Sequence, residues 1–162
     1  MRLLILNFTC LLVFACTMDD NCSPDTVRTS IEADKMIVLG FDSTSQRTTL
    51  AIEDGDKLFF KYDFEVEQCD NIFDDEWGEK LYFEIPVGTD DFEYFDDELA
   101  NITCYHLEYG AWVNSLPEAV TEGSIKGTKK SDGKWKVEGT VKVIRELPQE
   151  EVTITFDETF EL

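Results

Sequence analysis

The stretch KLFFKYDFEVE, residues 57–67, has an apolar residue at every even position and a charged residue at five of its six odd positions. Successive side chains of a β-strand point to opposite faces, so a period of two is typical of a strand with one buried face and one wetted face. The apolar members are Leu58, Phe60, Tyr62, Phe64 and Val66. This stretch therefore predicts a half-buried strand and favours a β fold.

The same alternation recurs on both sides of this stretch, with turn residues between the segments. Further strands are predicted at 36–41, 47–53, 80–86, 101–109, 122–129, 134–145 and 152–160. Asp54-Gly55-Asp56 is expected to turn the chain between the second and third strands, and Ser131-Asp132-Gly133 closes a later hairpin. The sequence predicts an all-β domain, either an antiparallel β-sandwich or a small β-barrel of about eight strands with meander connections.

The N-terminal residues 1–15 have the layout of an export signal. Arg2 supplies a positive charge, an apolar run follows from Leu3, and the small residue Ala15 stands at the expected cleavage point. The run is shorter than the roughly 20 apolar residues that a membrane-spanning helix needs. We therefore expect an export signal at 1–15, a flexible tether at 16–33 and a single β domain at 34–162.

The sequence Leu12-Val13-Phe14-Ala15-Cys16 resembles the lipobox of bacterial lipoproteins. This resemblance implies cleavage before Cys16, a lipid on its sulfur and attachment to a membrane. The following Asp19-Asp20 is similar to the short acidic signal that directs Bacteroidota lipoproteins to the cell surface, which implies an outer-membrane location. Cleavage at the same bond by an ordinary signal peptidase would instead release a secreted protein.

Three cysteines remain once Cys10 is removed with the signal and Cys16 is acylated. In an oxidising compartment one pair is expected among Cys22, Cys69 and Cys104. We predict a disulfide between Cys69 and Cys104, because both lie inside the predicted domain. Pairing of Cys22 with Cys69, which would join the tether to the domain, is the alternative.

The net charge of −21 is the most unusual property of the composition, and it arises from 35 acidic against 14 basic residues. Such a charge disfavours binding to nucleic acid and leaves cationic partners, divalent cations or solubility as explanations. The charge is uneven, because residues 53–98 carry a net −15 and residues 122–145 a net +4. Opposite charges on neighbouring strands of one sheet would explain the asymmetry, and a partner-binding surface is the alternative.

Two acidic loops and three aromatic residues are the candidate ligand-binding features. Asp70, Asp74 and Asp75 offer oxygen ligands for calcium, and the acidic stretch at 89–98 is a second candidate. Solvated acidic loops without an ion are the commoner outcome in a chain this acidic. The loop aromatics that could stack on a sugar ring or anchor a protein partner are Trp77, Tyr94 and Trp112.

The sequence gives no clear catalytic constellation. Carboxylate pairs could serve glycoside hydrolysis, but such pairs are expected by chance among so many acids, and His106 has no nucleophile assigned to it. The first expectation is an envelope-anchored lipoprotein whose domain binds a protein or glycan partner, without a cofactor. A periplasm-facing accessory lipoprotein is the second, and a small glycan-active hydrolase is the third.

Overall fold

The computed structural model describes residues 22–69, 76–113, 116–131, 133–146 and 148–162, which form an all-β sandwich. The five-stranded sheet has the order β2-β3-β5-β7-β8 and the four-stranded sheet the order β11-β10-β9-β6. Their strands are β2 (Thr26–Asp42), β3 (Arg47–Glu65), β5 (Trp77–Pro86), β7 (Tyr105–Gly110), β8 (Glu118–Ala119), β6 (Asp91–Phe95), β9 (Glu122–Ser131), β10 (Lys134–Glu146) and β11 (Gln149–Glu161). Two further short strands, β1 (Cys22–Ser23) and β4 (Gln68–Cys69), pair with each other.

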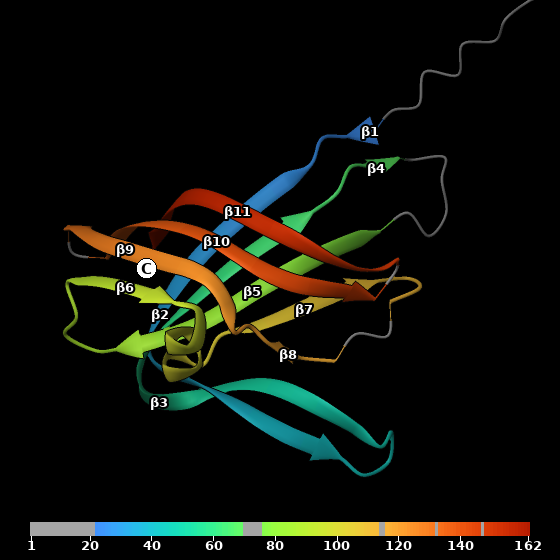
Figure 1. Cartoon of the computed structure of the whole chain (residues 1–162), viewed down its shortest axis with the longest axis horizontal. Helices are drawn as coiled ribbons and strands as arrows, with labels where there is room; N and C mark the ends of the chain where they lie inside the picture. Colours follow the sequence, from blue (N-terminus) through green and yellow to red (C-terminus); the bar gives the residue numbers. More distant parts are fainter. Residues whose placement is uncertain (1–21, 70–75, 114–115, 132, 147) are drawn as a thin grey trace, which may run out of the picture.

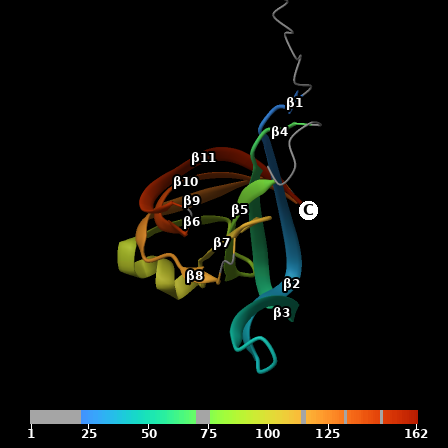
Figure 2. The same ribbon diagram turned by 90° about the vertical axis from the view of Figure 1, so that its right-hand side faces the viewer.

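The two larger sheets form separate layers, which Figures 1 and 2 show from two directions. Their edges meet where β2 lies against β11, and there Thr29 Oγ1 donates a hydrogen bond to the carbonyl oxygen of Thr159 at 2.8 Å. Eight strands are longer than two residues in the part of the chain that the structure describes. The predicted all-β class is confirmed. Of the two predicted architectures, the structure has the β-sandwich.

Aromatic rings from both sheets fill the space between the layers. Phe60 of β3 is fully buried and stacks on Phe83 of β5, with ring centroids 4.7 Å apart. Trp135 and Phe160 approach Phe60 from the four-stranded sheet at 5.7 Å and 5.6 Å. These rings occupy positions that the alternating pattern predicts as inward-facing, so the apolar stripe of residues 57–67 does form the core.

Two glycines of the four-stranded sheet make room for core rings. Gly139 of β10 lies directly opposite Phe156 of β11, and the phenyl ring covers the place where a Cβ on Gly139 would be. Gly127 of β9 has the same relationship to Phe92 of β6. A large side chain next to a glycine on a neighbouring strand is a known way to keep such a sheet densely packed.

The predicted start of the domain at residue 34 is too late. Strand β2 begins at Thr26 and pairs with β3 from Thr26 opposite Glu65, so much of the segment expected to be a flexible tether is a strand of the sheet. Its residues are mostly polar because β2 is an edge strand. Only Ile31 of the 26–34 segment is buried.

The predicted turn at Asp54-Gly55-Asp56 is also wrong, because β3 runs through these residues without reversing. A β-bulge accommodates them, in which Lys35 of β2 faces both Asp54 and Lys57. Asp34 beside it has a positive φ of 56°. A bulge of this kind bends the bulged strand. The chain reverses instead at residues 43–46, since Asp42 of β2 pairs with Arg47 of β3.

The acidic stretch at 89–98 is a strand and a short helix instead of a loop. Asp91–Phe95 forms β6 and pairs with β9, and Asp96–Ile102 forms the 3-10 helix η1, which includes the start of the predicted 101–109 strand. The chain thus leaves the five-stranded sheet after β5, forms β6 in the other sheet and returns for β7. The expected meander is interrupted at this point.

The predicted Cys69–Cys104 disulfide is wrong, and the alternative pairing is present. Cys22 and Cys69 lie directly opposite each other in the β1–β4 pair and are joined by a disulfide, while Cys104 is a buried free thiol. Burial raises the pKa of the Cys104 thiol. Cys104 faces the apolar core between the sheets, whereas Cys69 lies outside it, so strand pairing brings Cys22 to Cys69.

Candidate functional site

Four charged or titratable side chains gather between the sheets at one end of the sandwich. Glu79 of β5, His106 and Glu108 of β7 are each less than 5 % exposed, and Arg145 of β10 reaches them from the other sheet. Glu79 and Glu108 are direct partners in neighbouring strands, so two carboxylates lie side by side. We call these four residues, together with Trp77, the buried polar cluster.

Glu79 is the centre of this cluster. Its Oε1 accepts a hydrogen bond from Arg145 Nη2 at 2.9 Å, and its Oε2 lies 3.2 Å from both Arg145 Nε and His106 Nε2. Burial acts to raise the pKa of Glu79, but the hydrogen bonds from His106 and Arg145, with their charge, outweigh it and lower the pKa below its ordinary value of 4.5. The carboxylate is therefore held in its ionised form.

Glu108 joins the cluster to the backbone of the four-stranded sheet. Its Oε2 accepts a hydrogen bond of 2.6 Å from the backbone N–H of Glu146, at the end of β10, and its Oε1 accepts one of 3.2 Å from Trp77 Nε1. The Arg145 guanidinium lies over the Trp77 ring, 4.7 Å from its centroid. Glu79 and Glu108 of the five-stranded sheet thus bind the end of β10 in the other sheet. Glu79 binds the side chain of Arg145, and Glu108 binds the main chain of Glu146.

The polar groups of this cluster bind one another. Within the described ranges, no buried side-chain nitrogen or oxygen lacks a hydrogen-bond partner. Taking charged groups out of water is unfavourable unless they are paired. Here Glu79 is paired with His106 within its own sheet and with Arg145 across the two layers. The arrangement joins the two sheets at this end of the sandwich.

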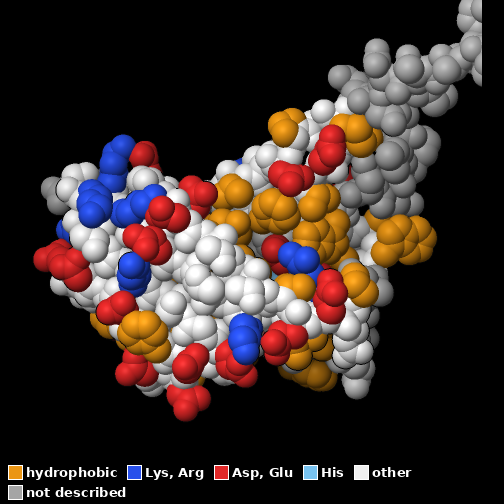
Figure 3. Space-filling model, turned by 45° about the horizontal axis from the view of Figure 1, so that its top comes forward, with side chains coloured by type: hydrophobic (Ala, Val, Ile, Leu, Met, Phe, Trp, Pro, Cys, Tyr) orange, Lys and Arg blue, Asp and Glu red, His pale blue; other side chains and the backbone are white. Residues whose placement is uncertain are grey.

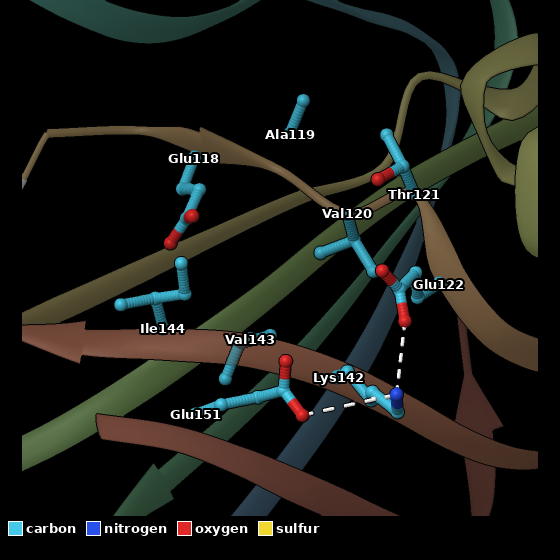
Figure 4. A pocket seen from close by; sticks show the side chains of 9 residues that line it. All are labelled: Glu118, Ala119, Val120, Thr121, Glu122, Lys142, Val143, Ile144 and Glu151. Atoms are coloured by element: carbon cyan, nitrogen blue, oxygen red, sulfur yellow. Dashed lines mark hydrogen bonds and ion pairs between the residues drawn. The ribbon is translucent and has the colours of Figure 1, made fainter.

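A pocket of about 100 Å³ lies between the segment 118–122 and strands β10 and β11 (Figure 4). Val120, Val143 and Ile144 form its apolar part. Glu122 and Glu151 are both bound by Lys142, whose Nζ is 2.9 Å from one carboxylate and 3.7 Å from the other. Lys142 therefore lies between these two exposed acids at the pocket.

The structure places the three aromatic candidates in different environments. Trp77 is half-buried against Phe64 and Arg145, and Tyr94 packs against the core beside Phe92. Trp112 is 73 % exposed. Only Trp112 presents most of its ring to solvent, and the three do not form one aromatic surface, because Trp77 and Tyr94 belong to different sheets.

Several predicted site residues lie outside the described residues. These are the lipidation residue Cys16 and the calcium candidates Asp70, Asp74 and Asp75. Elsewhere in the described ranges, one group of metal-type ligands lies close together, formed by Cys22, Cys69 and Glu67. Its two sulfur atoms are bonded to each other in the disulfide. In the same ranges, no helix is long and apolar enough to cross a bilayer.

The lysines of the basic hairpin β9–β10 pair with acids of their own sheet. The predicted explanation of the charge asymmetry holds only for β6, which pairs with β9, because β3 and β5 of the acidic segment 53–98 lie in the other sheet. Lys136 and Lys134 of β10 pair with Asp157 and Glu161 of β11, each at 2.6 Å, and Lys126 pairs with Glu138 at 2.8 Å. Figure 3 shows basic and acidic side chains interspersed at one end of the molecule, with hydrophobic side chains gathered nearer the other end. The lysines therefore have acidic neighbours within their own sheet.

The buried polar cluster was not predicted, although the strand patterns contain a signal for it. Glu79 shares the parity of the inward-facing Leu81, Phe83 and Ile85, so it points into the sandwich. Arg145 likewise continues the inward series that ends at Val143. A charged residue that continues a buried series at a strand end is therefore a sign of such a cluster.

No family model, no curated protein and no solved structure matches this chain.

Proposed function

We propose that this protein is a lipid-anchored, non-enzymatic binding module of the bacterial cell envelope. The observation that supports it best is the Cys22–Cys69 disulfide, because such bonds persist in exported proteins and are rare in the cytosol. Together with the signal-like residues 1–15 and the lipobox-like sequence before Cys16, this indicates export followed by acylation.

The disulfide would also hold the domain close to the membrane. Only five residues separate Cys16 from Cys22, and a fully extended chain of this length spans no more than about 20 Å. Without the disulfide, the short β1 strand could separate from β4 and lengthen the connection. A lipid on Cys16 would then place the β1–β4 end of the sandwich next to the bilayer.

A binding role accounts better for the polar residues than a catalytic one does. The buried carboxylates Glu79 and Glu108 are used in contacts between the sheets, and Lys142 bridges Glu122 and Glu151 in the pocket. A general acid or base needs room for a substrate within hydrogen-bond reach. Loops and edges on a rigid sandwich are, in contrast, a common platform for partner binding.

Mass spectrometry of the protein purified from its native membrane tests the anchor. We expect an N-terminal peptide that begins at an acylated Cys16, and we expect Cys16→Ser to abolish the acylation and release the protein from the membrane fraction. Cys10→Ser is the matched control, since this residue lies in the segment to be removed. An intact Met1, or an unmodified Cys16 sulfur in wild type, would contradict the proposal.

Protease treatment of intact cells then separates the two membrane faces. Degradation of the domain without lysis indicates display on the cell surface. Protection until the outer membrane is opened indicates a periplasm-facing accessory lipoprotein instead.

A further inference from the structure

The apolar space between the sheets is only partly covered at the end of the sandwich where β2 begins. Val27 of β2 lies directly opposite Phe64 of β3, and Phe64 packs against the core, so both side chains are on the inward face of the five-stranded sheet. Val27 is nevertheless 41 % exposed, and Phe64 is only partly buried. Strand β2 contacts β11 through Thr29, two residues further along the chain. Before that contact, the four-stranded sheet leaves part of the inward face exposed to solvent.

Two tryptophans lie at the same end. The Trp77 ring is 6.3 Å from the Phe64 ring. Trp77 also pairs with Gly110, the last residue of β7, so Trp112 follows two residues later near the start of β5, and it is 73 % exposed. Figure 3 shows hydrophobic side chains gathered on the side of the molecule where β1 and β4 lie in Figure 1. We call the following four apolar residues the open end: Val27, Phe64, Trp77 and Trp112.

The N-terminal segment joins the domain at this open end. Glu65, the last residue of β3, pairs with Thr26 of β2 and with Gly78 of β5. From there the chain continues to β4, which the disulfide joins to β1. Five residues separate Cys16 from Cys22, and they span at most about 20 Å when fully extended. A lipid on Cys16 would therefore bring the open end, and not the opposite end of the sandwich, to the bilayer.

The residues of the open end suit the surface of a bilayer. Tryptophan is enriched where a membrane meets water, because its ring is apolar while its indole N–H can bind a polar headgroup. Exposed apolar side chains that gather in one place are typical of an interaction surface. The net charge of −21 would repel anionic headgroups, so the contact must depend on the apolar side chains and on the nearby anchor.

We propose that the open end rests on the bilayer that holds the lipid of Cys16, with Val27 and Trp112 in contact with the headgroup region. The chain reversal at residues 43–46, at the opposite end in Figure 2, then points away from the membrane. This inference rests on the proposed lipid anchor and adds the orientation of the domain.

Quenching of tryptophan fluorescence by brominated lipid tests the contact. The acylated protein, purified from its membrane, is reconstituted in phosphatidylcholine vesicles whose acyl chains carry bromine near the headgroups. We expect the emission of wild type to be quenched, and Trp112→Phe to lose most of this quenching, because Trp135 is buried in the core.

A reporter at the opposite end is the matched control. Phe41 is 65 % exposed beside the chain reversal, so Phe41→Trp in the Trp112→Phe protein places a comparably exposed ring there. This reporter should not be quenched. Wild type that is not quenched on the vesicles, or a position 41 reporter quenched as strongly as Trp112, overturns the proposal.

Added charge separates a true contact from mere closeness to the anchor. Val27→Glu should lift the open end from the bilayer and remove most of the quenching of Trp112, whereas Phe41→Glu adds the same charge at the opposite end and should change nothing. Melting temperatures check that both variants fold. Equal quenching of folded Val27→Glu and wild type would overturn the contact. The Trp112→Phe experiment changes no buried residue, so it tests the proposal even if Val27→Glu fails to fold.

Flotation of the vesicles distinguishes this inference from the anchor on which it rests. Wild type that floats with the vesicles without being quenched overturns the contact and leaves the anchor standing. Wild type that does not float contradicts the anchor and the contact together. Sedimentation of the unanchored Cys16→Ser protein tests a second copy as the occupant: a dimer that Val27→Glu dissociates would also overturn the proposal.

Discussion

Glu79 Oε1 lies 2.9 Å from Arg145 Nη2, and the two residues belong to different sheets of the sandwich. Because Glu79 is nearly fully buried and Arg145 only partly, the pair closes one end of the core between β5 and β10.

Glu79→Gln removes the negative charge of the carboxylate that binds both Arg145 and His106. We expect a loss of about 2–3 kcal/mol in the free energy of unfolding, somewhat below the roughly 3–5 kcal/mol of a fully buried pair, because Arg145 is partly exposed. Urea denaturation measures this loss. Glu138→Gln, which breaks the exposed pair with Lys126, is the control and should leave the midpoint unchanged. Equal midpoints for Glu79→Gln and wild type would contradict a stabilising role.

The lowered pKa of Glu79 predicts how this contribution varies with pH. Since the folded-state pKa lies below the ordinary 4.5, the stabilisation is present above that pH and is lost as the pH falls through the folded-state pKa. The difference in unfolding free energy between wild type and Glu79→Gln should therefore shrink as the pH falls below about 4.5. Denaturation series at several pH values measure it. A difference that stays constant into strong acid would contradict the assignment.

The disulfide joins residues separated by 47 positions in the sequence. In the chain-entropy model, closing a loop of this size stabilises the folded state by about 4 kcal/mol, so Cys22→Ser should cost an amount of this order. Peptide mapping without reduction should show Cys22 linked to Cys69, and Cys104 labelled only after unfolding. Cys104→Ala is the control, because it leaves the link intact. A Cys69–Cys104 peptide would refute the pairing.

Trp77→Ala and Trp112→Ala should differ in their effect on stability. Trp77 packs against Phe64 and Arg145 and donates a hydrogen bond to Glu108, so its loss should cost about 2 kcal/mol, roughly half the cost of a fully buried Trp. Trp112 is 73 % exposed, and its replacement should leave the melting temperature unchanged. Glycan arrays with the Trp112 variant then test the sugar hypothesis without a folding artefact. Unchanged glycan binding by that variant would remove Trp112 from the hypothesis.

The sequence alone predicts the features of the fold that depend on the residue pattern within a single strand. The inward positions of Phe60, Tyr62, Phe83 and Trp135 follow from the period of two, and all four are buried. Strand β6 was missed because Asp91 and Glu93 resemble a solvated loop. Their strand is stabilised by pairing with Thr128 and Lys126 of β9, which lie more than thirty residues further along the chain.

The remaining errors also come from contacts between distant residues. Asp54-Gly55-Asp56 has the composition of a tight turn, but the register of β2 against β3 makes it one side of a bulge. The pairing of Cys22 with Cys69 depends on β1 lying against β4, which no local pattern indicates.

The Cys22–Cys69 bond also determines how a mechanical load would pass through the protein. Strands β2 and β3 both lie within the covalent loop that this bond closes. A pull between Cys22 and the chain reversal at residues 43–46 would divide at the disulfide and run along both strands in parallel. Neither strand could then be peeled from the sheet alone, so the tension would act on two strands together.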